Sequence, residues 1–532
     1  MSSTAAIFAF LNALNALQGL ALSALLAFIA ATLVNLFSGI DYPPNLPLIR
    51  EQKGKTSFSF RTRLAYYNDA KALFCEIYTK YSKLDKTCLM PGLGPRKEVI
   101  LPTSALRWLI SQPESILSSQ TAMLEINQFE WSAGHRKYGT DGWPGTVLKQ
   151  DMNPNLDLIA PEMYDEVKYA FDEKFGMDRG EWREIELVGT MKRVVAQISG
   201  RFTVGKPLCR DEKYLSYIIT YADLFVMNAG CLGILPKFLR PVFGPLTTLP
   251  IRYYIFKIKQ RFRPIFEQRL ALLNSTTSNN NNNATPSPNP EPLDHLQKML
   301  HHASKHHPSE LNLHEISICT SISHFGATHQ TSISMTNVLF NIISSNAQHN
   351  TISILRQEIA HFKKEGGGVW SKITIAKMVK MDSVIRETLR LHSFGNRNVF
   401  KQVMVSNLRT PDGILLPLGS MLSVLAYPSH IDADYFDDPL SFDPFRFSRL
   451  REKGQEGSGL GLGLGFVRRF VMDFMAKMML VYVLGEYEVG FGVGNGEGDE
   501  GKRPQTRWVS EAQMLPGKGV IFVRRRGNEE DE

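Results

Sequence analysis

Residues 381–390 read Met-Asp-Ser-Val-Ile-Arg-Glu-Thr-Leu-Arg, and this stretch decides the fold. Its apolar residues recur at helical spacing, which predicts a helix with one buried face. Glu387 and Arg390 lie off that face, three positions apart, where an ion pair can form. An exposed pair would contribute only about 0.2 to 0.5 kcal/mol. In this apolar context the two charges must be buried together, so they require a further partner.

The sequence downstream supplies that partner. Residues 411–413, Pro-Asp-Gly, predict a turn between two extended segments. Residues 438–447 then read Asp-Pro-Leu-Ser-Phe-Asp-Pro-Phe-Arg-Phe. Arg446 in this segment is therefore the candidate third member of the buried charge cluster.

A long helix is predicted upstream. Apolar residues recur at helical spacing from Ile318 to Ile342, and residues 326–332, Gly-Ala-Thr-His-Gln-Thr-Ser, interrupt them. Two small residues followed by polar ones allow a flat ligand to approach closely and place hydroxyl and imidazole groups beside it. The alternative is that the Ser and Thr side chains only hydrogen-bond back to helix carbonyls.

Length and composition narrow the function classes. The chain has 532 residues, 43% of them hydrophobic and 21% charged, which are globular values. Its net charge of +8 favours contact with anionic lipid or an acidic protein over nucleic acid. The 5 cysteines show no Cys-x-x-Cys spacing, so the sequence predicts neither a disulfide framework nor a zinc site, and a reducing compartment is expected.

The first forty residues contain no charged side chain. Residues 17–37 are long and apolar enough to span a membrane, and Arg50 and Lys53 follow on the downstream side. This pattern predicts a single-pass anchor at residues 1–40, with a cytosolic domain at residues 41–532. A cleaved signal peptide is the alternative, but no basic residue precedes the apolar segment.

One polar tract interrupts the large domain. Residues 274–292 include five consecutive asparagines and several prolines. Such a segment cannot bury a core, so the sequence predicts a disordered surface loop there.

The segments around residues 326–332, 381–390 and 438–447 together resemble the cytochrome P-450 superfamily, the haem-thiolate monooxygenases. The resemblance extends over nearly the whole chain, and residues 194–210 are similar to fungal members that tailor terpenoids and other secondary metabolites. The implied fold is mainly α with small β-sheets, preceded by one N-terminal transmembrane helix.

The resemblance also assigns roles to individual residues around a haem group. Glu387, Arg390 and Arg446 would form the buried charge triad behind the haem, and Arg397 resembles the position that pairs with a haem propionate. On the oxygen-binding side, the family has an acid or a His followed by a Thr. The corresponding residues here are His329, Gln330 and Thr331, so the Thr comes one position late. A carboxamide can still orient a water, which weakens proton delivery in principle without abolishing it.

The iron ligand departs from the family pattern. A haem-thiolate enzyme needs a Cys thiolate in a Gly-rich turn that opens the following helix. Residues 457–470 form the matching turn, and Phe466 falls where the Cys is expected. No Cys, His, Met or Tyr occurs between residues 457 and 470. No metal ligand is therefore assigned.

Three interpretations remain open. The natural transcript could encode a working monooxygenase that differs from this sequence by a few codons near residues 464–468. The chain could instead be a catalytically inactive P-450-like protein that binds a haem loosely or a lipophilic ligand. The third interpretation is a membrane-anchored scaffold without haem. The first is preferred, because loss of function would scatter damage rather than remove one short segment.

If the chain is active, the resemblance implies a haem-dependent monooxygenase that oxidises a lipophilic secondary metabolite such as a terpenoid or polyketide. Electrons would come from NADPH through a membrane-bound flavin reductase. The expected partners are this reductase, membrane lipid and a small apolar substrate, with no nucleic acid. The expected location is the endoplasmic reticulum membrane, with the catalytic domain in the cytosol.

Overall fold

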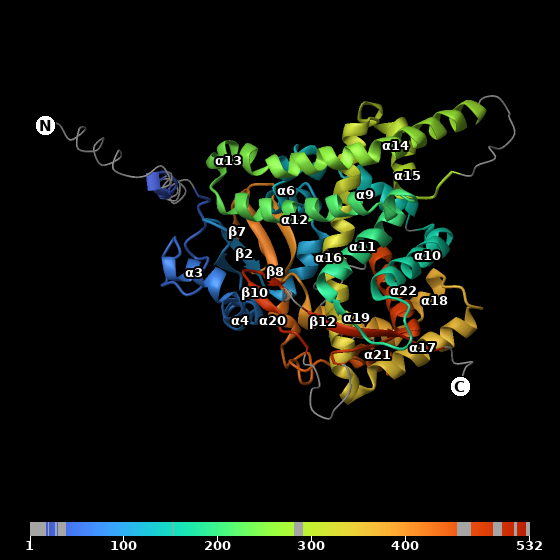
Figure 1. The fold of residues 1–532 in the computed structure, drawn as a ribbon. Helices are drawn as coiled ribbons and strands as arrows, with labels where there is room; N and C mark the ends of the chain where they lie inside the picture. The colour runs from blue at the N-terminus through green and yellow to red at the C-terminus, as the bar shows by residue number, and fades with distance from the viewer. Residues whose placement is uncertain are drawn as a thin grey trace.

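A computed structural model shows a mainly helical protein with small β-sheets, which confirms the expected fold class (Figure 1). The structure describes residues 18–19, 21–26, 29, 39–152, 154–280, 291–454, 470–492, 503–514 and 519–527.

The α-helices of these residues form most of the molecule. They are α3 (Phe60–Asn68), α4 (Ala70–Lys80), α5 (Leu106–Ser111), α6 (Ser119–Asn127), α7 (Phe129–Ser132), α8 (Lys137–Thr140), α9 (Trp143–Val147), α10 (Leu156–Phe175), α11 (Leu187–Thr203), α12 (Glu212–Ile234), α13 (Arg240–Thr247), α14 (Leu249–Asn280), α15 (His295–His306), α16 (Leu313–His349), α17 (Thr351–Glu365), α18 (Lys372–Ala376), α19 (Val379–His392), α20 (Tyr427–His430), α21 (Arg446–Glu452) and α22 (Phe470–Glu486).

The strands of the described residues form one five-stranded sheet, one three-stranded sheet and two two-stranded sheets. They are β1 (Cys88–Pro91), β2 (Lys97–Leu101), β3 (Leu117–Ser118), β4 (Arg183–Glu186), β5 (Arg397–Val403), β6 (Leu408–Arg409), β7 (Leu415–Leu416), β8 (Met421–Leu425), β9 (Tyr487–Gly490), β10 (Arg507–Val509), β11 (Ala512–Met514) and β12 (Val520–Arg525). The largest sheet has the order β1-β2-β8-β5-β3, in which β2 and β8 are parallel and the other pairs antiparallel. The hairpin of β6 and β7 encloses the predicted turn at residues 411–413.

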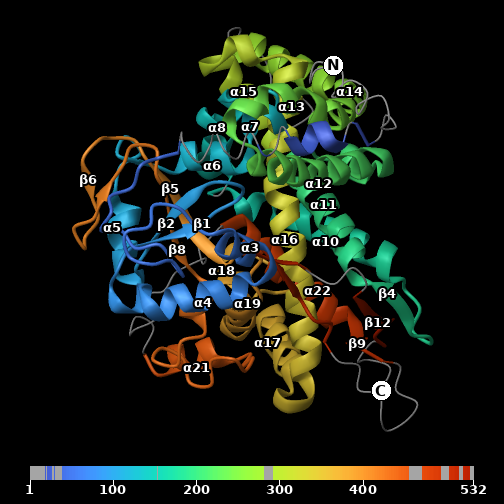
Figure 2. The ribbon, with the colours of Figure 1, turned by 90° about the vertical axis from the view of Figure 1, so that its left-hand side faces the viewer.

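Helix α16 runs through the middle of the molecule (Figure 2). It packs on α11, α12, α14 and α19, and its side chains contribute to two apolar cores. One core joins α16 to α10, α11, α19 and α22, and the other joins it to α12, α14 and α15. A third core lies between the five-stranded sheet and helices α3 and α4. The two helices that carry most of the predicted site residues, α16 and α19, therefore lie at the centre of the fold.

The predicted loop at residues 274–292 is described only in part. Helix α14 extends to Asn280 and so includes residues 274–280 of the predicted loop, while residues 281–290 lie outside the described residues. Its last core side chain is Leu273, which is 3% exposed, so the helix continues past the core that it packs on.

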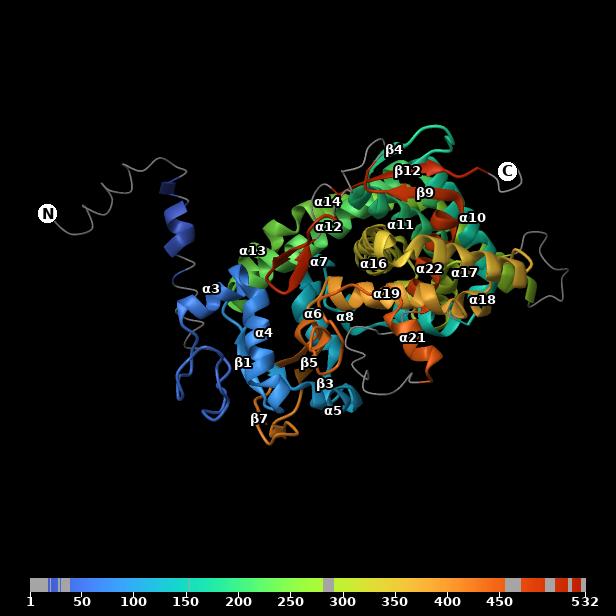
Figure 3. The ribbon, with the colours of Figure 1, turned by 90° about the horizontal axis from the view of Figure 1, so that it is seen from below.

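Most of the predicted membrane anchor lies outside the described residues. Residues 21–26 within it are helical and lie near α13, where Leu25 and Leu26 are exposed (Figure 3). Among the described helices, the one long and apolar enough to cross a membrane is α12, rather than an N-terminal helix. Because α12 packs against α14 and α16, it serves as a core helix of this fold.

Candidate functional site

Helix α19 brings Glu387 and Arg390 together in the interior. Arg390 Nη2 lies 2.7 Å from Glu387 Oε1, and both side chains are completely buried. The second guanidinium nitrogen, Nε, donates to Glu387 Oε2 at 2.8 Å, so the pair is bidentate. The i, i+3 spacing aligns the two side chains along the helix, and the surrounding apolar core shields them from water.

The third predicted member joins this pair from a distant part of the chain. Arg446 Nε donates to Glu387 Oε1 at 3.2 Å, so one carboxylate lies between two guanidinium groups. The guanidinium of Arg390 also donates to three backbone carbonyls. Its Nη1 donates to those of His430 and Pro439 at 2.7 and 2.5 Å, and its Nη2 to that of Ser441 at 3.0 Å. The cluster therefore joins α19 to the stretch from His430, at the end of α20, to Arg446, at the start of α21.

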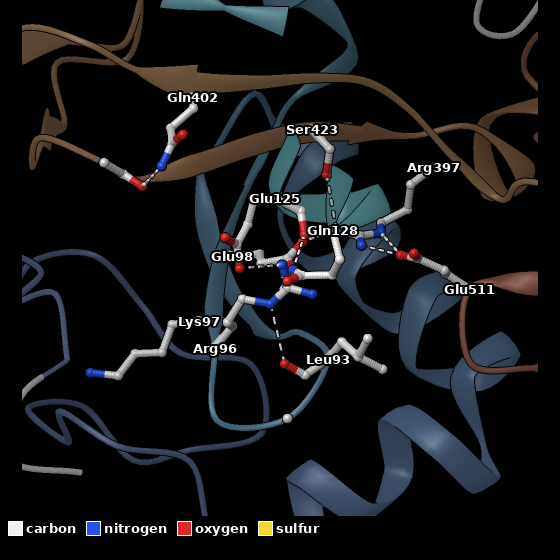
Figure 4. A network of polar contacts seen from close by, with 12 residues as sticks. Leu93, Arg96, Lys97, Glu98, Glu125, Gln128, Arg397, Gln402, Ser423 and Glu511 are labelled. Atoms are coloured by element: carbon white, nitrogen blue, oxygen red, sulfur yellow. Dashed lines mark hydrogen bonds and ion pairs between the residues drawn. The ribbon is translucent and has the colours of Figure 1, made fainter. Parts of the chain in front are cut away.

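Arg397 lies apart from this cluster, in a network that no sequence pattern predicted (Figure 4). Its guanidinium pairs with Glu98 of β2 and with Glu511, and Nη1 donates to Ser423 Oγ of β8 at 3.2 Å. Burial opposes the charge on Arg397, but the two carboxylates outweigh burial and raise the pKa of Arg397. Glu98 is also buried, yet Arg397 and then Arg96 outweigh desolvation and lower the pKa of Glu98.

The network continues toward the surface. Arg96 Nη1 lies 3.6 Å from Glu125 Oε1, and Arg240 Nη1 of α13 lies 2.9 Å from the same oxygen. A cavity of 540 Å³ opens beside it, lined in part by Glu125, Gln128, Arg240 and Met404. None of the predicted site residues lines this cavity, so the predicted site lies elsewhere.

The backbone beside Arg397 is irregular. The pairing of β5 with β8 shifts register between Asn398 and Lys401, which marks a β-bulge. Val399 within it has φ 56°, a left-handed conformation that a β-branched residue rarely adopts. Strain of this kind occurs where the surrounding structure fixes the aim of a side chain, here that of Arg397.

Helix α16 places the other three predicted residues on different faces. His329 is half-buried, with its ring 6.0 Å from that of Phe325 and 5.7 Å from that of Phe394. Burial lowers the pKa of His329, which favours the neutral imidazole. Gln330 is exposed, whereas Thr331 is buried and its Oγ1 has no hydrogen-bond partner among the described residues.

The two interpretations of the polar segment in α16 differ in outcome: a bond back to a helix carbonyl is present at Ser332, whereas ligand binding stays a prediction. Ser332 donates back to the carbonyl of His329 at 2.9 Å, as the purely structural explanation predicts. Thr328 instead reaches Ser199 of α11, with the two hydroxyl oxygens 3.2 Å apart. Gly326 is exposed although it lies in the central helix, and a Cβ added there would meet no atom within 4 Å. The described residues thus leave this face of α16 uncovered, as close approach by a flat ligand requires.

Arg503 is a further charge near α16, half-buried, that no sequence pattern predicted. Its Nε donates to Asn341 Oδ1 at 2.6 Å and its Nη2 to Asn337 Oδ1 at 2.7 Å. Burial lowers its pKa to about 10. Asn341 also lies 3.1 Å from the ring Nδ1 of His392, which links α16 to the end of α19. The asparagines at i, i+4 on an apolar helix were the available signal for this contact.

The residues can be tested against the haem group that the resemblance implies. The open face at Gly326 fits a flat group, whereas Arg397 already pairs with Glu98 and Glu511 and so carries no uncompensated charge for a propionate. The iron ligand does not fit. The five cysteines, all free, are Cys75, Cys88, Cys209, Cys231 and Cys319, and every one precedes α19. Residues 457–470 lack any thiolate, and Phe466 lies outside the described residues. Among the described residues, the open face of α16 thus fits such a group, whereas the already paired Arg397 and the missing thiolate do not.

Comparisons with known proteins agree with this geometry. Residues 148–487 match the family model for Cytochrome P450. The chain is 41% identical over 524 residues to cytochrome P450 monooxygenase pbrC of Penicillium brasilianum, covering 95% of this chain and 96% of the relative. It is 40% identical over 514 residues to cytochrome P450 monooxygenase astC of Aspergillus terreus, covering 92% of this chain and 94% of the relative.

A solved structure shows the same fold at lower sequence similarity. The cytochrome P450DA heme domain superposes with a TM-score of 0.61 and 12% identity, covering 92% of this chain and 99% of the heme domain. At this identity the likeness supports the fold alone.

Proposed function

Because this chain belongs to the cytochrome P450 family, whose similar members are monooxygenases, we propose that it is a membrane-anchored enzyme that oxidises a small lipophilic metabolite. A terpenoid or a polyketide is the substrate class that the sequence favours. The observation that carries the proposal is identity of about two residues in five along almost the entire length of fungal monooxygenases. In this family a bound haem supplies the oxidising chemistry.

The side chains beside the open face of α16 suit an apolar substrate. Phe325 stacks on Phe225 of α12 with ring centroids 4.6 Å apart, and Phe394 stands edge-on to His329. Aromatic walls with few polar groups bind apolar molecules and use those polar groups to orient them. We assign that orienting role to the neutral imidazole of His329.

Proton handling is assigned to two neighbouring residues. The hydroxyl of Thr331 is buried with a free hydrogen-bonding capacity, and the carboxamide of Gln330 is exposed and able to hold a water. The two groups lie on different faces of α16, so each would handle a proton separately: Gln330 through a surface water and Thr331 through its buried hydroxyl.

The membrane assignment has support from two surfaces. Residues 1–40 contain no charged side chain. Large apolar side chains are exposed along the segment that joins α12 to α14, near the described helical residues 21–26 (Figures 1 and 3). These exposed side chains are Ile234, Phe238, Val242, Leu246 and Leu249. Several large apolar side chains exposed along one segment are typical of a membrane contact. The proposed location is therefore the endoplasmic reticulum membrane, by a single N-terminal pass with a cytosolic domain.

Cell fractionation tests the membrane assignment. Removal of residues 1–40 is expected to leave part of the protein on membranes, and the further change of Phe238→Ser with Leu246→Ser to release it. The matched control is Val369→Ser with Ile373→Ser, which are equally exposed near α18. Full release by the control pair, or none by the first pair, would contradict the second contact surface.

NADPH and a flavin reductase are the proposed electron source. The net charge of +8 suits docking of an acidic reductase. Salt tests this part: NADPH consumption with the reductase is expected to fall as ionic strength rises, because screening weakens such docking.

A second candidate function is that of an inactive, lipophile-binding member of the family. The absence of Cys, His, Met and Tyr from residues 457–470 favours it. Sequencing the transcript across codons 455–475 addresses the origin of this segment. A Cys codon there supports the monooxygenase, and an uninterrupted Gly-Phe-Val-Arg-Arg reading supports the inactive protein.

The spectrum of the reduced, carbon-monoxide-bound protein separates the two functions. A thiolate-type Soret band is expected of a monooxygenase, and the lack of this band supports the inactive protein. The variant Phe466→Cys is expected to acquire the band, because it places a thiolate where the family has one. Leu464→Cys is the matched control two positions earlier, and an equal band from both variants would contradict the assignment of Phe466.

A further inference from the structure

A histidine-rich segment on α15 has no part in the proposed function. Residues 301–307 read His-His-Ala-Ser-Lys-His-His. His302 and His306 are four positions apart on the helix, and their ring centroids lie 4.7 Å apart. Two imidazoles at i, i+4 on one helix face are the arrangement by which helices chelate zinc.

Two carboxylates from other segments approach the same end of α15. His307 follows the last residue of α15, Asp141 follows α8, and Glu310 ends the short 3-10 helix Pro308–Glu310. Their ligand atoms all lie within 4.8 Å of one another. Figure 2 shows α15 lying over α8, so segments far apart in sequence meet here.

A buried indole organises this group. Trp143, 5% exposed, stacks on the rings of His302 and His307 at 5.6 and 5.3 Å, with interplanar angles of 9° and 19°. Its Nε1 donates to Glu310 Oε2 at 2.9 Å. Partners of this kind orient metal ligands in advance, so the cluster has an ordered frame and is more than a set of exposed side chains.

We propose that Asp141, His307 and Glu310, with His302 and His306 beside them, form a binding site for a divalent transition-metal ion such as Zn²⁺. Imidazole nitrogens and carboxylate oxygens are ligands that zinc accepts at about 2.0 to 2.2 Å. The two carboxylates balance the charge of the ion. A bound ion would fasten α15 to the segment between α8 and α9.

The groups that face this site include one opposing cation. Lys137 Nζ lies 3.7 Å from Glu310 Oε1 and 2.8 Å from Glu315 Oε2. It competes with a metal ion for Glu310.

Zinc titration of the untagged full-length chain tests the proposal by calorimetry. The unaltered protein is expected to bind one Zn²⁺, and His307→Ala to weaken binding at least tenfold. Asp141→Asn is the second variant, because this exposed, isosteric change does not endanger folding. His361→Ala is the matched control, since His361 is an exposed histidine beside a glutamate on α17. Unchanged affinity in both site variants, or equal weakening in the control, would overturn the site.

A gain of affinity provides an independent arm. Lys137→Gln removes the competing ammonium and is expected to tighten zinc binding severalfold, whereas weaker binding would contradict the proposed ligand set. Thermal unfolding adds a structural readout. Zinc is expected to raise the Tm of the unaltered protein and to leave that of His307→Ala unchanged, because only a protein that binds the ion gains from it. A zinc-induced rise of equal size in both proteins would also overturn the site.

Discussion

Arg390 and Glu387 face each other with both side chains completely buried, and Arg390 Nη2 lies 2.7 Å from Glu387 Oε1. Arg446 adds a second guanidinium to the same carboxylate at 3.2 Å. One negative charge therefore stabilises two positive charges inside the protein, and it joins α19 to the start of α21.

Neutralising this carboxylate should destabilise the fold severely. Glu387→Gln leaves two guanidinium groups without a counter-ion, and breaking a buried pair in this way typically costs about 3 to 5 kcal/mol. Urea denaturation followed by circular dichroism measures the loss. Glu365→Gln is the control, because Glu365 pairs with Lys377 at the exposed surface. An unchanged midpoint in Glu387→Gln would show that the triad is not a structural element.

Stability should fall in acid because of a buried histidine. Burial lowers the pKa of His324 to about 4 from its usual 6.5. The unfolded chain therefore binds a proton more readily than the folded one, so stability is complete above pH 6.5 and is lost as pH falls toward 4. In His324→Gln, the loss of unfolding free energy in acid should be smaller by about 3 kcal/mol.

Unfolding free energies at pH 7 and pH 4.5 measure this effect. The exposed His361, changed to Gln, is the matched control and should retain the full acid sensitivity. His324→Gln with an equally steep loss of stability in acid would refute the role of His324. His295 and His392 also have pKa values lowered chiefly by burial, to about 4 and about 3, so some acid sensitivity should remain.

Two threonines of α16 should respond oppositely to the same change. Thr331→Val removes a buried hydroxyl that has no partner among the described residues, so the free energy of unfolding should rise by about 1 kcal/mol. Thr328→Val removes the contact with Ser199 and should lower the free energy of unfolding by about 1 kcal/mol. If Thr331 delivers protons, product formed per NADPH should fall in Thr331→Val despite the gain in stability. An equal yield of product per NADPH in the unaltered protein and in Thr331→Val would count against that role.

The change Gly326→Ala should raise the stability of the fold and weaken the binding of haem. Alanine there meets no atom within 4 Å, and its helix propensity should add about 0.5 to 1 kcal/mol of stability. Gly230→Ala on α12 is the matched control, since its Cβ is equally free. Only Gly326→Ala should weaken binding of added haem, followed by absorbance, because only that Cβ projects from the open face of α16. Equal binding by both variants would exclude Gly326 as a contact.

The sequence predicted the elements whose signals are local. The apolar spacing of α16 and α19 placed both helices, and the Pro-Asp-Gly turn placed the β6–β7 hairpin. The pairing of Glu387 with Arg390 follows from three positions on one helix. The membrane anchor at residues 1–40 and the turn at Phe466 remain predictions, because they lie largely or wholly outside the described residues.

The network around Arg397 was not predictable in the same way. Glu98 and Glu511 come from segments that the resemblance did not mark, and they reach Arg397 only after β2, β5 and β8 have formed one sheet. The chelating cluster around His307 likewise depends on α8 and α15 meeting, although the histidine spacing on α15 was visible in the sequence.

The sequence by itself thus determined the central helices, the Glu387–Arg390 pair and the lack of a cysteine after Cys319. The burial of this pair and the arrival of Arg446 were expected from the sequence, and the tertiary structure supplied their geometry. Only the tertiary structure decided that Gln330 is exposed while Thr331 is buried. The physical reason is distance along the chain. Helical periodicity and i, i+3 contacts depend on neighbouring residues, whereas burial and charge partners depend on which distant segments pack together.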